Sequence, residues 1–160
     1  MEQIAAYSLR PIHKEDEPFL LEIYSSTRAD ELALVPWGAA QKQAFLQMQF
    51  SAQQKHYRAY FPQAAHDMVV VEGQPIGRLY VDRRETEIRI LDVTLLPHAR
   101  GRGIGTQILL NLIKEAEHEK KSCSIYVESF NRSLGLFERL GFVKKEENGA
   151  SWLMEWRAGS

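Results

Sequence analysis

The stretch from Leu95 to Thr106, LLPHARGRGIGT, constrains the fold of this chain more than any other. It joins a strongly apolar strand to a strongly amphipathic helix, and glycines stand at alternate positions 101, 103 and 105. Glycines remove the side chains that would keep a ligand away from the backbone. The freed amide hydrogens lie at a helix amino-terminus, whose positive dipole end attracts anions. Arg100 and Arg102 add permanent charges with forked donors that suit phosphate oxygens. The turn therefore predicts recognition of a phosphate or pyrophosphate.

The residues after these glycines narrow the choice of phosphate ligand. A P-loop requires Gly-Lys-Ser/Thr, but Gly105 is followed by Thr106 and Gln107, so a P-loop is excluded. A dinucleotide fingerprint requires a glycine or alanine where this chain has Ile108. It also needs an acid at the end of the next strand, which Glu128 imitates, so a dinucleotide site stays open as the weaker alternative. A motif can also have a purely structural role, which we call its structural interpretation. For these glycines it is a plain turn from strand to helix that binds no ligand.

Composition indicates an ordinary globular protein. The chain has 160 residues, is 44% hydrophobic, and carries 20 basic against 21 acidic residues, for a formal net charge of -1. Without a global basic field it is not expected to bind nucleic acid or an anionic membrane. No apolar run approaches the roughly 20 residues of a membrane-spanning helix, and the first ten residues lack a secretory layout. The single cysteine, Cys123, fits a reducing compartment, so we expect a cytoplasmic protein.

Hydrophobic periodicity predicts a mixture of strands and helices. The expected strands cover residues 5–12, 67–72, 76–82, 87–96, 124–128 and 151–156. The expected helices follow residues 13–16 and 36–38, begin at 104, and cover 133–140. No linker, repeat or charge block divides the sequence, so we expect one domain over residues 1–160. The predicted class is α+β (α/β mixed), a central, mostly antiparallel, twisted sheet of six to seven strands flanked by about four helices, with one strand-helix-strand unit inside it.

Two motifs resemble those of the GCN5-related N-acetyltransferase (GNAT) family. Residues 100–105, RGRGIG, match the Arg/Gln-x-x-Gly-x-Gly/Ala acetyl-CoA motif, and residues 95–97 resemble the family's splayed strand end. Downstream, Val127, Asn131 and residues 136–142, LFERLGF, are similar to the family's asparagine and its Leu-Tyr-Glu-x-Leu-Gly-Phe helix and strand. Two motifs in the expected order are more specific than either alone. The resemblance covers the whole chain in outline and residues 93–142 sharply, and it implies an acyl-CoA N-acyltransferase-like fold.

The resemblance implies that acetyl-CoA (coenzyme A) binds as a co-substrate. No metal is expected, since the histidines are scattered along the chain. Backbone groups of Val93 and Leu95 would contact the pantetheine arm. Asn131 would contact the cofactor near its pantetheine end, and a helix cap is its structural interpretation. The pyrophosphate would lie on the turn that already predicts an anion site, namely Arg100, Gly101, Arg102, Gly103, Ile104, Gly105 and Thr106.

The implied reaction is direct acetyl transfer from the thioester to an amine, which requires a base. Where the family commonly has a carboxylate, this chain has Arg89. Asp92, an acid inside an apolar run, is our candidate base. Its structural interpretation is a buried acid bound to backbone or to Arg89. Regular alternation would put Glu87 and Asp92 on opposite faces of the strand, with Glu87 a solvated strand end.

The acid that protonates the departing thiolate is also in question. The family's tyrosine corresponds to Phe137, which cannot donate a proton. Tyr126, on the strand beside the expected cleft, is our substitute, and a half-buried strand aromatic is its structural interpretation. Cys123 has no evident base partner, so we expect a packing residue and a ternary complex rather than an acetyl-cysteine intermediate. The five histidines show no metal-ligand spacing.

Two functions of different classes follow. The first is an N-acetyltransferase acting on a primary amine of a small molecule, peptide or protein, as a monomer or homodimer. The second is a catalytically weak acyl-CoA sensor, suggested by Phe137 and Arg89. Trp37 and the acids Asp30 and Glu31 upstream suit a cationic acceptor, and an aromatic that anchors a helix corner is the structural interpretation of Trp37.

Overall fold

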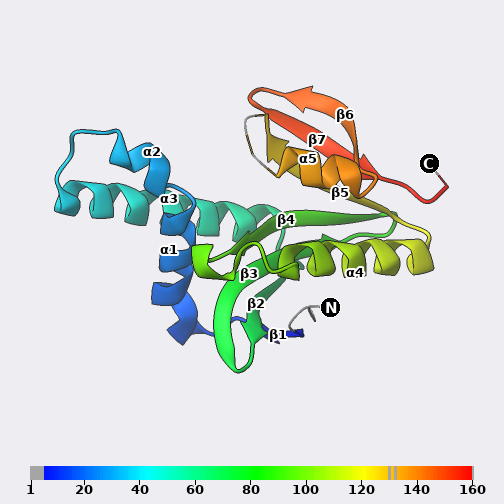
Figure 1. Cartoon of the computed structure of the whole chain (residues 1–160), viewed down its shortest axis with the longest axis horizontal. Coiled ribbons are helices and arrows are strands. Elements are labelled where there is room, and N and C mark those ends of the chain that lie inside the picture. The colour runs from blue at the N-terminus through cyan, green and yellow to red at the C-terminus, as the bar shows by residue number, and fades with distance from the viewer. Residues whose placement is uncertain (1–5, 130, 132, 160) are drawn as a thin grey trace.

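One sheet organises the fold. In the computed structural model, the described residues 6–129, 131 and 133–159 build seven strands in the order β1-β2-β3-β4-β5-β7-β6 (Figure 1). The strands are β1 (Tyr7–Pro11), β2 (Ala65–Val71), β3 (Gln74–Arg83), β4 (Glu87–Leu95), β5 (Ser122–Glu128), β6 (Val143–Asn148) and β7 (Ser151–Trp156). The helices in these residues are α1 (Glu17–Ser26), α2 (Ala29–Ala33), α3 (Ala39–Tyr60), α4 (Ile104–Glu119) and α5 (Leu134–Arg139), with 3-10 turns at Lys14–Asp16 and Pro97–Ala99. The predicted α+β fold is confirmed; Ala5, where the first strand was expected to begin, lies outside the described residues.

The strand-helix-strand unit predicted from the sequence is β4–α4–β5. Among the described strands, β4 and β5 form the parallel pair and all other neighbours are antiparallel. α4 forms because Ile104, Ile108, Leu112 and Ala116 recur at helical spacing and are buried on one face. The helix ends at Lys120, whose left-handed φ of 59° turns the chain toward β5.

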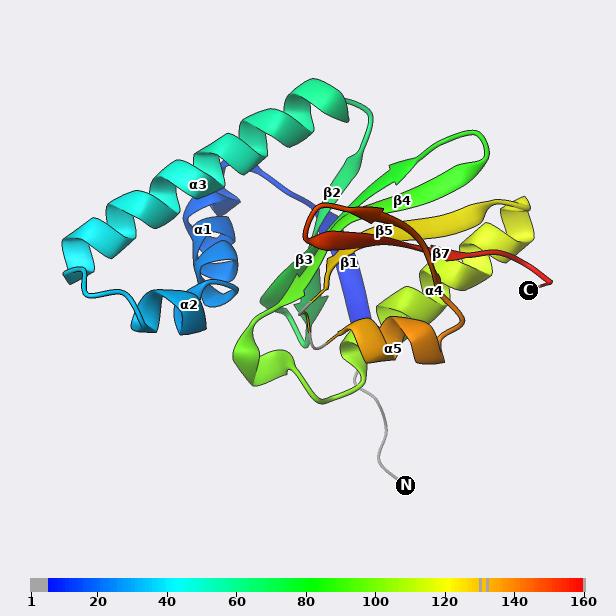
Figure 2. The same ribbon diagram turned by 90° about the horizontal axis from the view of Figure 1, so that it is seen from above.

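The helices lie on both sides of the sheet (Figure 2). α4 and α5 pack on one face, where they share the larger core with apolar side chains of the strands. α1 and α3 pack on the other face around a second core that includes Met68 of β2 and Leu96 after β4. No helix in the described residues combines the length and apolarity that crossing a bilayer requires.

A β-bulge in the middle of β4 changes which side chains share a face. Tyr80 of β3 pairs with Asp92 and Val81 pairs with Ile90, so Leu91 is the extra residue. An extra residue reverses the alternation of every side chain after it. Glu87 and Asp92 therefore lie on the same face, the one toward α3. The prediction of opposite faces is wrong because it assumed a regular strand.

Two elements escaped the sequence patterns. β6 reads VKKEEN and is exposed along its whole length, so no apolar alternation marks it. It forms by pairing with β7, and its charges suit an edge strand that has to resist pairing with other chains. α2 has only five residues, too few for a periodic pattern to reveal.

Candidate functional site

The strands β4 and β5 separate partway along their length. They pair over residues 87–90 of β4, and both strands continue beyond that point. The N–H of Leu96 donates to the carbonyl of Ile76 on β3 at 2.8 Å. Because backbone groups point alternately to the two sides of a strand, those of Leu95 and Val93 are directed away from β3, toward the gap. The gap thus presents the backbone N–H and C=O groups of Val93 and Leu95 to an extended ligand.

The glycine turn lies between the end of β4 and the start of α4. Gly101 and Gly103 have φ of +76° and +83°, left-handed conformations that glycine adopts readily. Gly103 caps α4, and its carbonyl accepts the N–H of Gln107 at 3.0 Å. The N–H groups of residues 104–106, in the first turn, have no acceptor within the helix. These are the backbone features on which the predicted anion site depends.

The side chains of the turn are less constrained than its backbone. Arg100 and Arg102 are exposed, and Arg100 Nε donates to the carbonyl of Leu95 at 3.0 Å. A methyl group at Gly105 would lie 3.7 Å from Leu95 Cδ1, an ordinary contact. Packing therefore does not require glycine at position 105. At position 101 the positive φ favours glycine over other residues.

Asn131 forms a turn just before α5. Its Oδ1 accepts the N–H of Ser133 at 2.8 Å, and its carbonyl accepts the N–H of Leu134 at 3.1 Å. These bonds form a turn that leads into α5, whose N-cap is Ser133, so Asn131 is not the helix cap that was its structural interpretation. A contact between Asn131 and a cofactor stays a prediction.

Asp92 belongs to a polar network beneath α3. Its Oδ2 accepts a hydrogen bond from Arg78 Nε at 2.6 Å, and its Oδ1 accepts one from Thr94 Oγ1 at 2.8 Å. The side chain of Arg78 is 1% exposed and that of Asp92 is 21% exposed. Arg78 Nη2 donates to Gln53 Oε1 on α3 at 2.5 Å, while the buried Nη1 has no partner within the described residues. Arg89, the partner expected for Asp92, is bound elsewhere.

Sequence reasoning missed Arg78, although a signal existed. A charge inside the apolar strand 76–82 requires a partner. The next strand along the chain contains one acid inside its own apolar run, Asp92. Two isolated opposite charges on consecutive strands were the available indication that they pair.

Aromatic side chains surround this network. Tyr57 OH donates to the carbonyl of the bulge residue Leu91 at 3.1 Å. The ring of Tyr57 packs edge-on against Tyr80 at 5.0 Å, and His66 stacks flat on Tyr80 at 4.1 Å. Burial raises the pKa of Tyr57 to about 12. Burial, together with the charge of Arg78, lowers the pKa of His66 to about 4. Both groups are therefore uncharged at neutral pH.

Tyr126 lies on the same face as Asp92, directly beyond the last pair between β4 and β5. The register shows this, because Arg89 pairs with Ser124 and Tyr126 is two residues further along β5. The guanidinium of Arg89 lies 5.0 Å from the centre of the Tyr126 ring, and Tyr126 is 43% exposed. Both candidates for catalysis are thus placed where the strands begin to separate.

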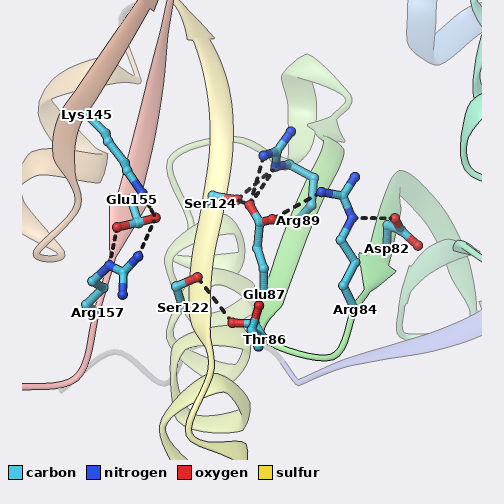
Figure 3. A network of polar contacts seen from close by, with 10 residues as sticks. All are labelled: Asp82, Arg84, Thr86, Glu87, Arg89, Ser122, Ser124, Lys145, Glu155 and Arg157. Atoms are coloured by element: carbon cyan, nitrogen blue, oxygen red, sulfur yellow. Dashed lines mark hydrogen bonds and ion pairs between the residues drawn. The ribbon is translucent and has the colours of Figure 1, made fainter.

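A network of charged side chains occupies this face at the end of β4 opposite the glycine turn (Figure 3). Arg89 donates to Glu87 Oε2 and to Ser124 Oγ, each at 2.8 Å. Glu87 also accepts hydrogen bonds from Ser124 and Arg84. Burial opposes the charge of Glu87, but the bonds from Ser124 and Arg89 outweigh it and hold the pKa of Glu87 below its usual value. The expectation of a solvated strand end is wrong, since pairing with β5 encloses this residue.

A pocket of about 270 Å³ opens beside these charges. Its lining combines β4 and β5 with the carboxyl-terminal strands, namely Thr86, Glu87, Arg89, Ser122, Lys145, Leu153, Glu155 and Arg157. Glu155 forms ion pairs with Lys145 and Arg157 there. Because the pocket lies at the far end of β4, it does not belong to the predicted phosphate site.

Three further residues have packing roles. Phe137 is buried and packs edge-on against Phe142 at 5.5 Å. Trp37 packs edge-on against Phe45 at 5.2 Å before α3. Cys123 is buried, and burial raises the pKa of its thiol to about 12, so it is not poised as a nucleophile.

Within the described residues, no group of three His, Cys, Asp or Glu side chains is placed to hold a metal ion.

Comparison with known proteins was made on sequence and on structure. The sequence model of the acetyltransferase (GNAT) family matches residues 15–142. A comparison with curated proteins gave no match. PaiA N-acetyltransferase from Thermoplasma acidophilum, in complex with coenzyme A, is similar with 16% identity, a TM-score of 0.70, and coverage of 95% of this chain and 99% of that one.

Two further solved structures agree. An acetyltransferase from Thermus thermophilus has 15% identity and a TM-score of 0.68, covering 98% of this chain and 99% of that one. A GNAT family acetyltransferase from Elizabethkingia anophelis with acetyl-CoA bound has 14% identity and a TM-score of 0.62, covering 94% and 97%. At these identities the structural likeness establishes the fold.

Proposed function

This chain belongs to the acetyltransferase (GNAT) family, and on that premise we propose that residues 1–160 are one N-acetyltransferase domain. The proposed reaction transfers the acetyl group of acetyl-CoA to a primary amine of a small molecule, peptide or protein in a ternary complex. The observation that carries the proposal is the separation of β4 from β5 beside the left-handed glycine turn. A gap with backbone donors and acceptors that ends in an anion site matches an extended ligand with a pyrophosphate.

The proposed cofactor contacts follow the order of the chain. The backbones of Val93 and Leu95 bind the pantetheine arm along the gap. The amides from Gly101 to Thr106 bind the pyrophosphate, with Arg100 and Arg102 as flanking charges, and Asn131 contacts the pantetheine end. Two of the similar solved structures are described with coenzyme A or acetyl-CoA bound, which supports this assignment by analogy.

The proposed chemistry uses Asp92 as base and Tyr126 as acid. An ammonium ion cannot attack a carbonyl, so Asp92 accepts a proton from the acceptor, directly or through a water. The neutral amine attacks the thioester carbon, the C–N bond forms, the C–S bond breaks, and the nitrogen loses its second proton to solvent to give the neutral amide. Asp92 then releases the first proton to solvent, which restores the carboxylate. Tyr126 then gives its phenolic proton to the coenzyme A thiolate and regains one from solvent. The two groups lie on one face at the start of the strand separation, where the thioester would arrive.

A matched pair of substitutions tests the cofactor site. Gly101 and Gly73 have nearly the same φ, +76° and +77°, and a Cβ at either position would meet nothing within 4 Å. Alanine therefore costs the same backbone strain in both, about 1–2 kcal/mol. We expect Gly101→Ala to weaken coenzyme A binding by about tenfold or more in calorimetry, and Gly73→Ala to leave it unchanged. Equal affinities in the two variants, or heat with NAD and none with coenzyme A, would contradict the proposal.

A second candidate function is a non-catalytic or weakly catalytic acyl-CoA sensor. Phe137 favours it, because this side chain is buried against Phe142 in the place of a proton donor. A panel of amino acids, polyamines, aminoglycosides and a lysine peptide separates the two functions. Release of free coenzyme A with any of these amines, followed with a thiol reagent, supports the transferase. Tight coenzyme A binding without release on any amine supports the sensor.

A further inference from the structure

We propose that Arg78 and Thr94 are positioning residues that fix the Asp92 carboxylate toward the acceptor amine, an inference that rests on the proposed function. The two residues bind different oxygens of Asp92. Arg78 Nε reaches Oδ2 at 2.6 Å, and Thr94 Oγ1 reaches Oδ1 at 2.8 Å. A carboxylate bonded at both oxygens cannot rotate about its terminal bond, yet Asp92 keeps 21% of its side chain exposed. Its remaining lone pairs are therefore presented in one fixed direction.

α3 anchors this arrangement at two points. Gln53 accepts a hydrogen bond from Arg78 Nη2 at 2.5 Å and so fixes the guanidinium from above the sheet. One helical turn later, Tyr57 OH donates to the carbonyl of Leu91 at 3.1 Å. Leu91 is the bulge residue that brings Asp92 onto this face. The helix thus fixes both the partner of Asp92 and the backbone that carries it.

Stability alone does not account for a guanidinium at this position. Replacing a buried ion pair by apolar side chains of similar volume is often neutral or stabilising. Arg78 pairs across the sheet with the fully buried Met68, which belongs to the second core, so an apolar side chain would have apolar neighbours here. Arg78 Nη1 is buried without a partner in the described residues, which is unfavourable. What the arginine supplies, and an apolar residue would not, is the bond to Asp92.

A double-mutant cycle distinguishes positioning from a structural role. Thr94→Val keeps the shape of the side chain and removes the donor to Asp92, while Asp92→Asn removes the base. We expect Asp92→Asn to lower kcat by about 10²–10⁴-fold, and Thr94→Val to lower it roughly tenfold with KM for acetyl-CoA unchanged. In the Asp92→Asn background, Thr94→Val is expected to cause no further loss, because it acts only through the carboxylate. The substrate is whichever amine of the panel the wild-type protein turns over fastest.

Substitutions of Arg78 extend the test. Arg78→Met is expected to lower kcat, and Arg78→Lys to restore part of it, since an ammonium retains the charge without the fork. Arg83→Met is the control, because Arg83 forms a two-bond pair with Glu115 of α4, at 2.5 and 3.0 Å, away from Asp92. It is expected to leave kcat unchanged. Where an Arg78 variant does not fold, the Thr94 cycle decides.

The outcomes separate the two levels of the proposal. No turnover by the wild-type protein on any amine would overturn the proposed function and this inference with it. Turnover that Asp92→Asn does not reduce would overturn the inference and leave acetyl transfer standing. The inference would also be overturned if Thr94→Val lowered kcat by the same factor in the wild-type and in the Asp92→Asn background. Calorimetry with coenzyme A on every variant confirms that the cofactor site is intact.

Discussion

His66→Phe is expected to remove a loss of stability that the native protein suffers in mild acid. Burial and the nearby charge of Arg78 lower the pKa of His66 from 6.5 to about 4. As the pH falls through 6.5, the unfolded chain binds a proton that the folded chain does not accept. The free energy of unfolding therefore decreases as the pH falls from about 7 toward 4. Above pH 7 the imidazole is neutral in both states and contributes no pH dependence.

The size of this loss follows from the two pKa values. One pKa unit corresponds to about 1.36 kcal/mol, so the whole difference corresponds to roughly 3 kcal/mol. About 2 kcal/mol of it is expressed at pH 5, where the unfolded imidazole is charged and the folded one remains mostly neutral. Phenylalanine keeps a flat ring against Tyr80, which stacks on His66 at 4.1 Å, and cannot titrate.

Denaturant unfolding at pH 7.5 and pH 5 measures the effect. We expect the decrease in the free energy of unfolding between these pH values to be about 2 kcal/mol smaller in His66→Phe than in wild type. The control is His56→Phe, because His56 is exposed on α3 and also has an aromatic neighbour, Tyr60, at 4.7 Å. This variant should show the wild-type decrease. The same decrease in wild type and in His66→Phe would refute the conclusion that the network beneath α3 holds His66 neutral.

Two further predictions concern packing. Gly77→Ala is expected to destabilise the fold by about 1–3 kcal/mol, because the new Cβ would collide with the backbone of Thr94 and lie 3.0 Å from Leu95 Cα. Each kcal/mol should lower the melting temperature by roughly 2–4 °C. An unchanged melting temperature would show that β4 moves to make room for the Cβ. Cys123 is expected to react with a thiol reagent at pH 8 no faster than the protein unfolds, because the thiol is buried and its pKa is about 12. Rapid labelling without denaturant would contradict that burial.

The features that the sequence predicted are those fixed within a few residues. The stripe of α4 follows from apolar side chains at helical spacing, and Gly101 and Gly103 mark a turn because their left-handed φ disfavours other residues. The turn that Asn131 forms before α5 is local in the same sense, since its side chain bonds a backbone group two residues away. Local rules of backbone conformation decide all of these before any tertiary contact forms.

The features that escaped prediction depend on pairing between distant segments. Arg78 and Asp92 become partners through the register of β3 and β4, and Gln53 reaches Arg78 from a helix 25 residues away. The enclosure of Glu87 depends on β5, which follows only after the whole of α4. Periodicity along one strand carries no information about what covers it. The partners of charged side chains in this sheet are set by topology.

The bulge at Leu91 connects the fold to the candidate site. In a regular strand Asp92 would share the face of Ile88 and Ile90, which are at most 1% exposed in the core beneath α4. A carboxylate there would be desolvated among apolar side chains, at high cost. The extra residue instead places Val93 against that core and turns Asp92 toward Arg78 on the other face. A bulge also bends its strand, and β4 stops pairing with β5 at Ile90, immediately before it. One inserted residue thus accounts for both the orientation of the proposed base and the start of the gap in which the thioester would lie.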